Sequence, residues 1–316
     1  MSIFIHSSLQ YGRSSLMEAC ENGHAEVVKI LVSAGAHVND QNEYGRSSLM
    51  EACENGHAEV VKILVSAGAH VNDQDENGTS LLMLACIYGH AEVVRILVSA
   101  GAHVSDQNKD GWSSLMEACW YGHAEVVRIL VSAGAHVNDQ NEDGWSSLML
   151  ACMNGQAEVV RILVSAGAHV SDQDKDGWSS LMLACMNGQA EVVRILVSAG
   201  AHVSDQDKDG DAALHWAART DHGECVRLLL SEPGIDANLV NHSGQTPLKL
   251  ARDYEVLTML QKYTTSCEDF PVHTYGKVIM CGDSGAGKST LTEVRHTWCI
   301  DIFTVYSVIT DTLFNK

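Results

Sequence analysis

The residues most able to perform chemistry lie near the end of the chain, in the run Gly282-Asp283-Ser284-Gly285-Ala286-Gly287-Lys288-Ser289-Thr290. This run satisfies the pattern G-x-x-x-x-G-K-[ST], in which glycines let backbone N–H groups wrap a phosphate. Lys288 would then reach the β- and γ-phosphates, and the Ser289 hydroxyl would ligate Mg²⁺. The run predicts a phosphate-binding loop for GTP or ATP, and the alternative is a plain glycine-rich turn.

Such a loop needs a strand before it and a helix after it, because the helix N-terminus adds positive charge that faces the phosphates. Residues 277–281 form a short β-type run, and residues 291–295 can be helical. Only 26 residues follow Thr290 in the 316-residue chain, whereas a complete nucleotide domain takes about 100–200 residues. No second magnesium aspartate and no guanine-reading motif follow. We therefore expect this chain to bind nucleotide weakly or not at all.

Most of the chain consists of one sequence unit that returns at a fixed spacing. The unit from Tyr11 to Glu43 returns almost unchanged from Tyr44 to Glu76, and a turn glycine marks each copy. These glycines are Gly12, Gly45, Gly78, Gly111, Gly144, Gly177 and Gly210, 33 residues apart, and Gly244, which follows 34 residues later. A fixed period of this length indicates one supersecondary unit stacked many times.

Each unit predicts two short helices followed by a polar turn. In the first copy, Ser14 and Ser15 can cap a helix that Asn22-Gly23 ends. A second helix is predicted from Ala25 to Ala34, and the stretch from Val38 to Gly45 is turn-like. Because neither helix can bury its apolar stripe alone, the neighbouring copies must supply the other wall of the core.

The unit resembles an ankyrin repeat, whose family pattern is D-G-x-T-P-L-H-x-A-A-x-x-G-H-x-x-V-V-x-L-L-L-x-x-G-A-x-x-N. The resemblance covers about residues 11–262 and implies an all-α solenoid, a stack of about seven to eight repeats with β-turn fingers. The T-P-L-H corner reads Ser14-Ser15-Leu16-Met17 in the first copy, and only Thr246-Pro247-Leu248-Lys249 comes close to the family form. The missing proline predicts a less pre-organised helix start.

Near-identical copies reveal the few positions that differ, and these positions predict a partner-binding surface. By the resemblance they are hairpin-tip and inner-helix sites that line the concave groove of an ankyrin stack. The candidate protein-binding residues are Arg13, Arg46, Trp112, Trp145, Trp178, Glu21, Glu54, Tyr88, Trp120, Tyr121, Met153 and Met186. Because Trp, Tyr and Arg dominate most binding energies, we expect an aromatic groove in repeats three to six and a more polar stretch in repeats one and two.

Two structural interpretations of these positions stay open. The tryptophans after the turn glycine lie in polar turns, so we expect exposed indoles, with packing on the neighbouring turn as the alternative. The glutamates of the first helices can instead close capping boxes with the serine three residues earlier. These pairs are Ser15–Glu18, Ser48–Glu51 and Ser114–Glu117.

Composition argues against several classes of partner and compartment. The chain carries 40 acidic and 20 basic residues, a formal charge of −20, so we expect neither nucleic acid nor a membrane as a partner. Residues 1–10 lack signal-peptide features, and no apolar run approaches the about 18 residues of a membrane span. The repeated cysteines are predicted to be free core residues, which favours a reducing, cytoplasmic location. They are Cys20, Cys53, Cys86, Cys119, Cys152 and Cys185.

The sequence thus predicts four parts: an N-terminal segment (1–10), an ankyrin repeat domain (11–262), a linker (263–275) and a truncated P-loop NTPase fragment (276–316). Ankyrin repeats before such a loop resemble the ankyrin–Roc arrangement of Roco-type GTPases and death-associated protein kinases, with nucleotide-oligomerising ATPases as the alternative. No nucleophile–base triad is present, so we expect a non-enzymatic scaffold without a firmly assigned cofactor. We also expect a monomer. The alternative is the sensor part of a signalling protein regulated by GTP or ATP with Mg²⁺.

Overall fold

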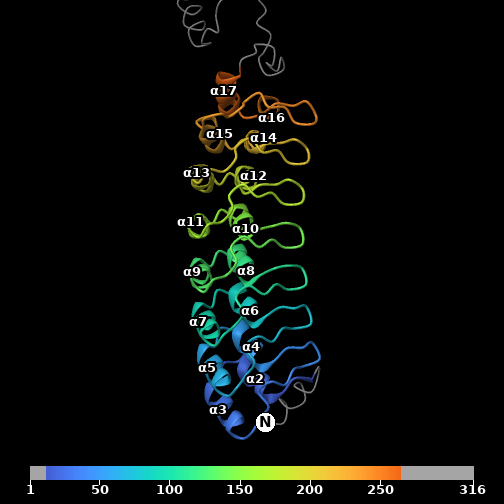
Figure 1. Cartoon of the computed structure of the whole chain (residues 1–316), viewed down its shortest axis with the longest axis vertical. Coiled ribbons are helices and arrows are strands. Elements are labelled where there is room, and N and C mark those ends of the chain that lie inside the picture. Colours follow the sequence, from blue (N-terminus) through green and yellow to red (C-terminus); the bar gives the residue numbers. More distant parts are fainter. Residues whose placement is uncertain (1–11, 265–316) are drawn as a thin grey trace, which may run out of the picture. The chain divides into compact units, whose positions relative to one another are not determined.

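The computed structural model describes residues 12–264, which form a stack of paired antiparallel helices with a finger-like loop between successive pairs (Figure 1). The inner row, beside the fingers, contains α2 (Ser15–Glu21), α4 (Ser48–Glu54), α6 (Leu81–Ile87), α8 (Ser114–Tyr121), α10 (Ser147–Met153), α12 (Ser180–Met186), α14 (Ala213–Arg219) and α16 (Pro247–Leu250). The outer row contains α3 (Ala25–Ser33), α5 (Ala58–Ser66), α7 (Ala91–Ser99), α9 (Ala124–Ser132), α11 (Ala157–Ser165), α13 (Ala190–Ser198), α15 (Gly223–Leu230) and α17 (Tyr254–Tyr263). The expected all-α stack is confirmed for this part of the chain.

The inner helices of the first six repeats are capped by a serine that lies one residue before the capping serine of the predicted boxes. The Ser14 hydroxyl accepts a hydrogen bond from the Met17 backbone N–H at 3.2 Å, and the Ser14 N–H faces the Met17 sulfur at 3.5 Å. A methionine thus takes the second place in the capping box. The predicted boxes between Ser15 and Glu18, and at the equivalent pairs, are therefore wrong, because Ser15 already lies inside the helix.

The core is continuous from one repeat to the next, as the stripes of the two helices require. Val60 of α5 is 1% exposed, but its counterpart Val27 in the first outer helix is 45% exposed because fewer side chains cover it. The seven cysteines of the described residues are free and buried, and burial raises the pKa of the Cys20 thiol to about 12. A helix pair therefore needs neighbours on both sides to bury its apolar stripe.

Each finger is closed by side-chain and backbone hydrogen bonds. In the fourth repeat the Asn108 side chain accepts from the backbone N–H groups of Asp110 and Trp112, at 3.0 and 2.9 Å, and Gly111 takes a φ of +78°. An isolated antiparallel bridge then pairs Gln107 with Ser113, where α8 begins. This closure fixes the residue after the turn glycine beside the start of the inner helix.

The predicted strand, phosphate loop and helix of residues 276–316 lie outside the described residues, as do residues 1–10. Within residues 12–264, no helix is both long and apolar enough to cross a membrane.

Candidate protein-binding face

Three positions of each repeat meet on one side of the stack. We call them the finger position, the mid-helix position and the end-helix position; in the first repeat they are Arg13, Glu18 and Glu21. The mid-helix and end-helix positions lie one turn apart on the inner helix, and the finger position folds back over both. The row of these positions along the described repeats is the inner face, and it contains most of the residues that differ between repeats.

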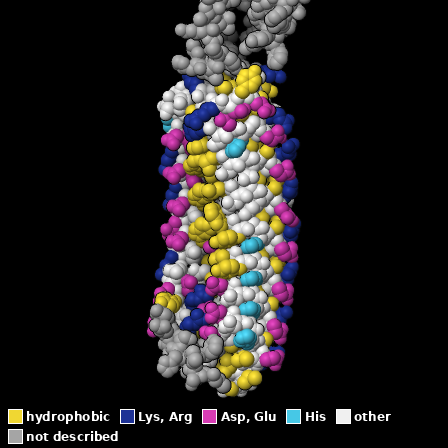
Figure 2. All heavy atoms as spheres, turned by 180° about the vertical axis from the view of Figure 1, so that it is seen from behind, with side chains coloured by type: hydrophobic (Ala, Val, Ile, Leu, Met, Phe, Trp, Pro, Cys, Tyr) yellow, Lys and Arg dark blue, Asp and Glu magenta, His cyan; other side chains and the backbone are white. Residues whose placement is uncertain are grey.

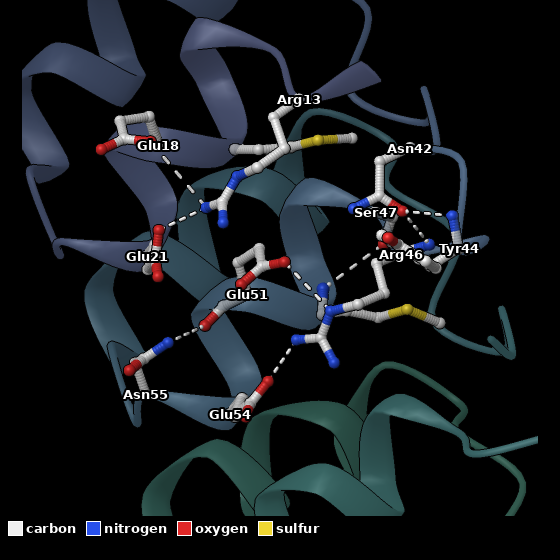
Figure 3. A network of polar contacts seen from close by, with 12 residues as sticks. Arg13, Glu18, Glu21, Asn42, Tyr44, Arg46, Ser47, Glu51, Glu54 and Asn55 are labelled. Carbon is white, nitrogen blue, oxygen red and sulfur yellow. Dashed lines mark hydrogen bonds and ion pairs between the residues drawn. The ribbon is translucent and has the colours of Figure 1, made fainter. Parts of the chain in front are cut away.

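The N-terminal part of the inner face is a network of ion pairs (Figure 3). Arg13 pairs with Glu21 and lies 3.9 Å from Glu18. Arg46 pairs with Glu54, and its Nε lies 3.0 Å from the carboxylate of Glu51. These predicted binding residues thus lie together, but each arginine is already paired with glutamates of its own repeat.

Aromatic and sulfur-containing side chains occupy the middle part of the inner face. Trp112 at the finger position meets Trp120 at the end-helix position edge-on, with ring centroids 6.0 Å apart. Trp178 lies 4.4 Å from the ring of Trp216 in the next repeat. The indoles of Trp112, Trp145 and Trp178 are half-buried, so the expectation of exposed tryptophans is wrong, because the finger closes them onto the inner helices.

The other predicted residues extend this aromatic part. Met153 and Met186 are half-buried at the end-helix positions of repeats five and six, whose finger positions are Trp145 and Trp178. Tyr88 and Tyr121 are 52% and 51% exposed, and each ring stacks on a histidine two residues later. Figure 2 shows an apolar stripe along this side of the stack that gives way to charged side chains toward the N-terminal repeats.

Glu117 is the residue whose role the sequence reasoning missed. Its counterparts Leu84, Leu150 and Leu183 are buried at the mid-helix position, whereas Glu117 is half-buried and its carboxylate has no hydrogen bond or ion pair among the described residues. Burial raises the pKa of the Glu117 carboxyl to about 7. The sequence did contain a signal that Glu117 lacks a cation: the finger position is arginine in repeats one and two but Trp112 in repeat four.

The model of the family "Ankyrin repeats (3 copies)" matches residues 3–75, 67–141, 133–207 and 200–269. The chain belongs to the ankyrin-repeat family. Among solved structures, this ankyrin stack is similar to the crystal structure of the human ASB11 ankyrin repeat domain, with 30% identity and a TM-score of 0.65. That similarity covers 71% of this chain and 100% of the ASB11 domain chain. No curated protein matches the sequence.

The outer row of the ankyrin stack differs from the inner face in being uniform. Successive outer helices are joined by ion pairs between residues 30 apart, such as Lys62 with Glu92 at 3.1 Å and Arg128 with Glu158 at 2.6 Å. Hollows between outer helices, including one lined by Arg128 and Arg161, are made of these same framework residues. The outer row therefore offers a partner the same paired charges in almost every repeat.

The raised pKa of Glu117 predicts a pH dependence of stability. A folded pKa above the ordinary value of about 4.5 means that the native state binds more protons between pH 4.5 and 7, so stability falls as the pH rises through this window. We expect Glu117→Gln to remove about 1–2 kcal/mol of this loss, allowing for partial solvent access. Urea unfolding of both proteins at pH 5 and pH 8 measures it, and equal pH dependences would contradict the raised pKa.

Proposed function

We propose that this ankyrin-repeat protein is an interaction scaffold that binds a protein partner along the inner face of repeats three to six. The observation that carries the proposal is the contrast between the two sides of the stack. The outer row repeats one set of paired charges, whereas the inner face carries the tryptophans, methionines and tyrosines that distinguish one repeat from another. Partner recognition requires side chains that differ along the surface, and the inner face supplies them.

The chemistry of the middle part suits a protein surface. Half-buried indoles are already held by the fingers, so little side-chain freedom is lost when a partner covers their remaining edges. Tryptophan and tyrosine provide large contact areas with polar groups at their rims. The ion-paired cluster of Arg13 and Arg46 contributes less to affinity, because its charges are already satisfied within the stack.

The triple substitution Trp112→Ala, Trp145→Ala and Trp178→Ala tests the proposed face. We expect it to reduce partner capture from lysate at least about tenfold, because each truncation removes a large contact area. Quantitative mass spectrometry of proteins retained by the full chain measures this reduction.

The matched control removes charges from the outer row with Arg128→Ala, Arg161→Ala and Arg194→Ala. Trp145→Ala alone is the milder variant for separating binding from folding, because the Trp145 indole contacts no other aromatic ring within residues 12–264, unlike those of Trp112 and Trp178. Capture that survives the tryptophan substitutions, or that falls equally in the outer-row control, would exclude the inner face.

Nucleotide binding is a second candidate function, supported by the pattern from Gly282 to Thr290 in the sequence alone. The family match ends at residue 269, so this run has no comparison behind it. Isothermal titration of the full chain with GTP or ATP and Mg²⁺ tests it. A heat of binding that Lys288→Ala abolishes would support nucleotide binding by the phosphate loop. We expect the wild-type chain to give little or no heat of binding.

A further inference from the structure

The inner face holds a guanidinium in three of its own repeats. In repeats one and two, an arginine at the finger position pairs with the glutamate at the end-helix position. In repeat seven the order is reversed: Arg219 at the end-helix position donates to Asp211 at the finger position at 2.6 Å. The Arg219 guanidinium also lies 4.5 Å from the centre of the Trp216 ring at the mid-helix position.

These repeats show which groups a guanidinium contacts at the inner face. In repeat two, Arg46 Nε donates to the mid-helix carboxylate of Glu51 at 3.0 Å. In repeat seven, the mid-helix residue is an indole that faces the cation. A carboxylate gives charge-assisted hydrogen bonds and an indole gives a cation–π contact.

Repeat four combines both kinds of group, but none of its three inner-face positions carries a cation. Glu117 keeps the mid-helix carboxylate, while Trp112 and Trp120 replace the Arg46 and Glu54 of repeat two. The two indoles meet edge-on, and Glu117 lies one helical turn before Trp120 on α8. Within residues 12–264 the Glu117 side chain forms no ion pair. Leucine occupies this position, fully packed, in repeats three, five and six, so the fold itself does not require an acid here.

We propose that repeat four binds an arginine side chain of the protein partner, with its guanidinium paired to Glu117 and packed against Trp112 and Trp120. This inference rests on the proposed function and names the chemistry of the partner at one point of the face. Arginine fits better than lysine, because a flat guanidinium can donate two hydrogen bonds to a carboxylate while it stacks on an indole. Apolar residues beside the arginine would contact Ile87 and Met153, the half-buried residues at the end-helix positions of repeats three and five.

The charge of the chain favours the same kind of segment. A formal charge of −20 attracts a basic segment over distances at which contacts are not yet formed. The carboxylates of repeats one and two are already paired, so Glu117 is the acid of the inner face that gains most from a cation brought by the partner. Binding of a guanidinium would also favour the ionised form of Glu117, which burial disfavours.

Selection of random peptides displayed on phage against the full chain tests the inference. We expect the enriched peptides to share an arginine flanked by apolar residues. Replacing this arginine with citrulline, which has nearly the same shape but no charge, should weaken binding to the wild-type chain about tenfold or more. The same replacement should change binding to Glu117→Leu less than about twofold, since the pairing carboxylate is gone.

Two protein controls keep the result interpretable. Glu117→Leu gives residues 114–119 the sequence that begins the inner helices of repeats five and six, so it is expected to fold, and thermal unfolding checks this. Glu18→Gln changes a glutamate at the same position of repeat one that is already near an arginine, and it should leave the citrulline effect intact.

The outcomes separate the two proposals. Enriched peptides that lack arginine, that carry lysine instead, or that tolerate citrulline on the wild-type chain would overturn the arginine site. If such peptides still lose binding when the tryptophans are replaced, the proposed face stands without it. Enrichment that ignores both Glu117 and the tryptophans, or no enrichment at all, would contradict the proposed function as well.

Discussion

Arg46→Met is expected to lower the free energy of unfolding by about 3 kcal/mol. The Arg46 guanidinium contacts two carboxylates, and one of them, Glu51, is only 6% exposed. Methionine matches the length of the arginine stem but leaves Glu51 buried without a cation. Removal of one partner from a buried pair costs more than the pair itself contributes, because the remaining charge stays desolvated.

Urea unfolding measures this loss, and hydrogen exchange in α4 and α6 shows whether it is local. Arg13→Met is the matched control: its glutamates are more exposed, so the expected cost is below about 1 kcal/mol. The double substitution Arg46→Met and Glu51→Leu puts apolar residues at the finger and mid-helix positions, as in repeats five and six, and should recover most of the stability. Equal losses for Arg46→Met and Arg13→Met would show that burial of Glu51 is not the cause.

Gly144→Ala is expected to cost about 2–4 kcal/mol, through strain at positive φ and a backbone collision. Gly144 has a φ of +87°, and a Cβ there would lie 2.9 Å from the backbone nitrogen of Lys175 in the next finger. That nitrogen also donates to the Asp143 carbonyl at 3.1 Å, a bond that links the two fingers. Moving the finger away would therefore lose the hydrogen bond as well.

Gly134 provides the matched control, because its φ is also +87° but nothing lies within 4 Å of an added Cβ. Gly134→Ala should cost only the conformational strain, about 1–2 kcal/mol. The difference between the free energies of unfolding of the two variants, measured with urea, gives the cost of the collision between neighbouring fingers. If Gly134→Ala lowered the free energy of unfolding as much as Gly144→Ala, the close contact between fingers would not contribute to the cost of the Gly144 substitution.

The architecture could be predicted from the sequence because periodicity is a property of whole segments. The spacing of the turn glycines and the apolar stripes placed each helix pair, and the structure agrees in α2 and α3. The capping register was missed because methionine is not an ordinary capping residue, although Met17 lies where a glutamate or glutamine normally would. An error of one residue at the helix start was enough to give the mid-helix glutamates a capping role that they do not have.

The candidate face was predictable as a set of positions but not as a set of contacts. Comparison of the copies found the positions that vary, since the framework around them does not. It could not show that Arg46 and Glu54 neutralise each other, or that Trp178 packs against Trp216, because these contacts depend on how the finger folds back. Glu117 became informative only once the other mid-helix glutamates were seen beside arginines.

The ladder of outer-row ion pairs has an evolutionary and engineering consequence. Each ion pair joins a lysine or arginine to a glutamate 30 residues later, from Lys29–Glu59 to Arg194–Glu224. Each of these outer helices presents a basic residue to the helix that follows and a glutamate to the helix that precedes it. Insertion or excision of one 33-residue repeat would therefore leave neighbouring helices that can still form the same ion pair. The chain could thus gain or lose a repeat by unequal recombination while its outer-row ion pairs re-form. Such an event would change the distance between the ion-paired and aromatic parts of the inner face, and with it the spacing of contacts available to the proposed partner.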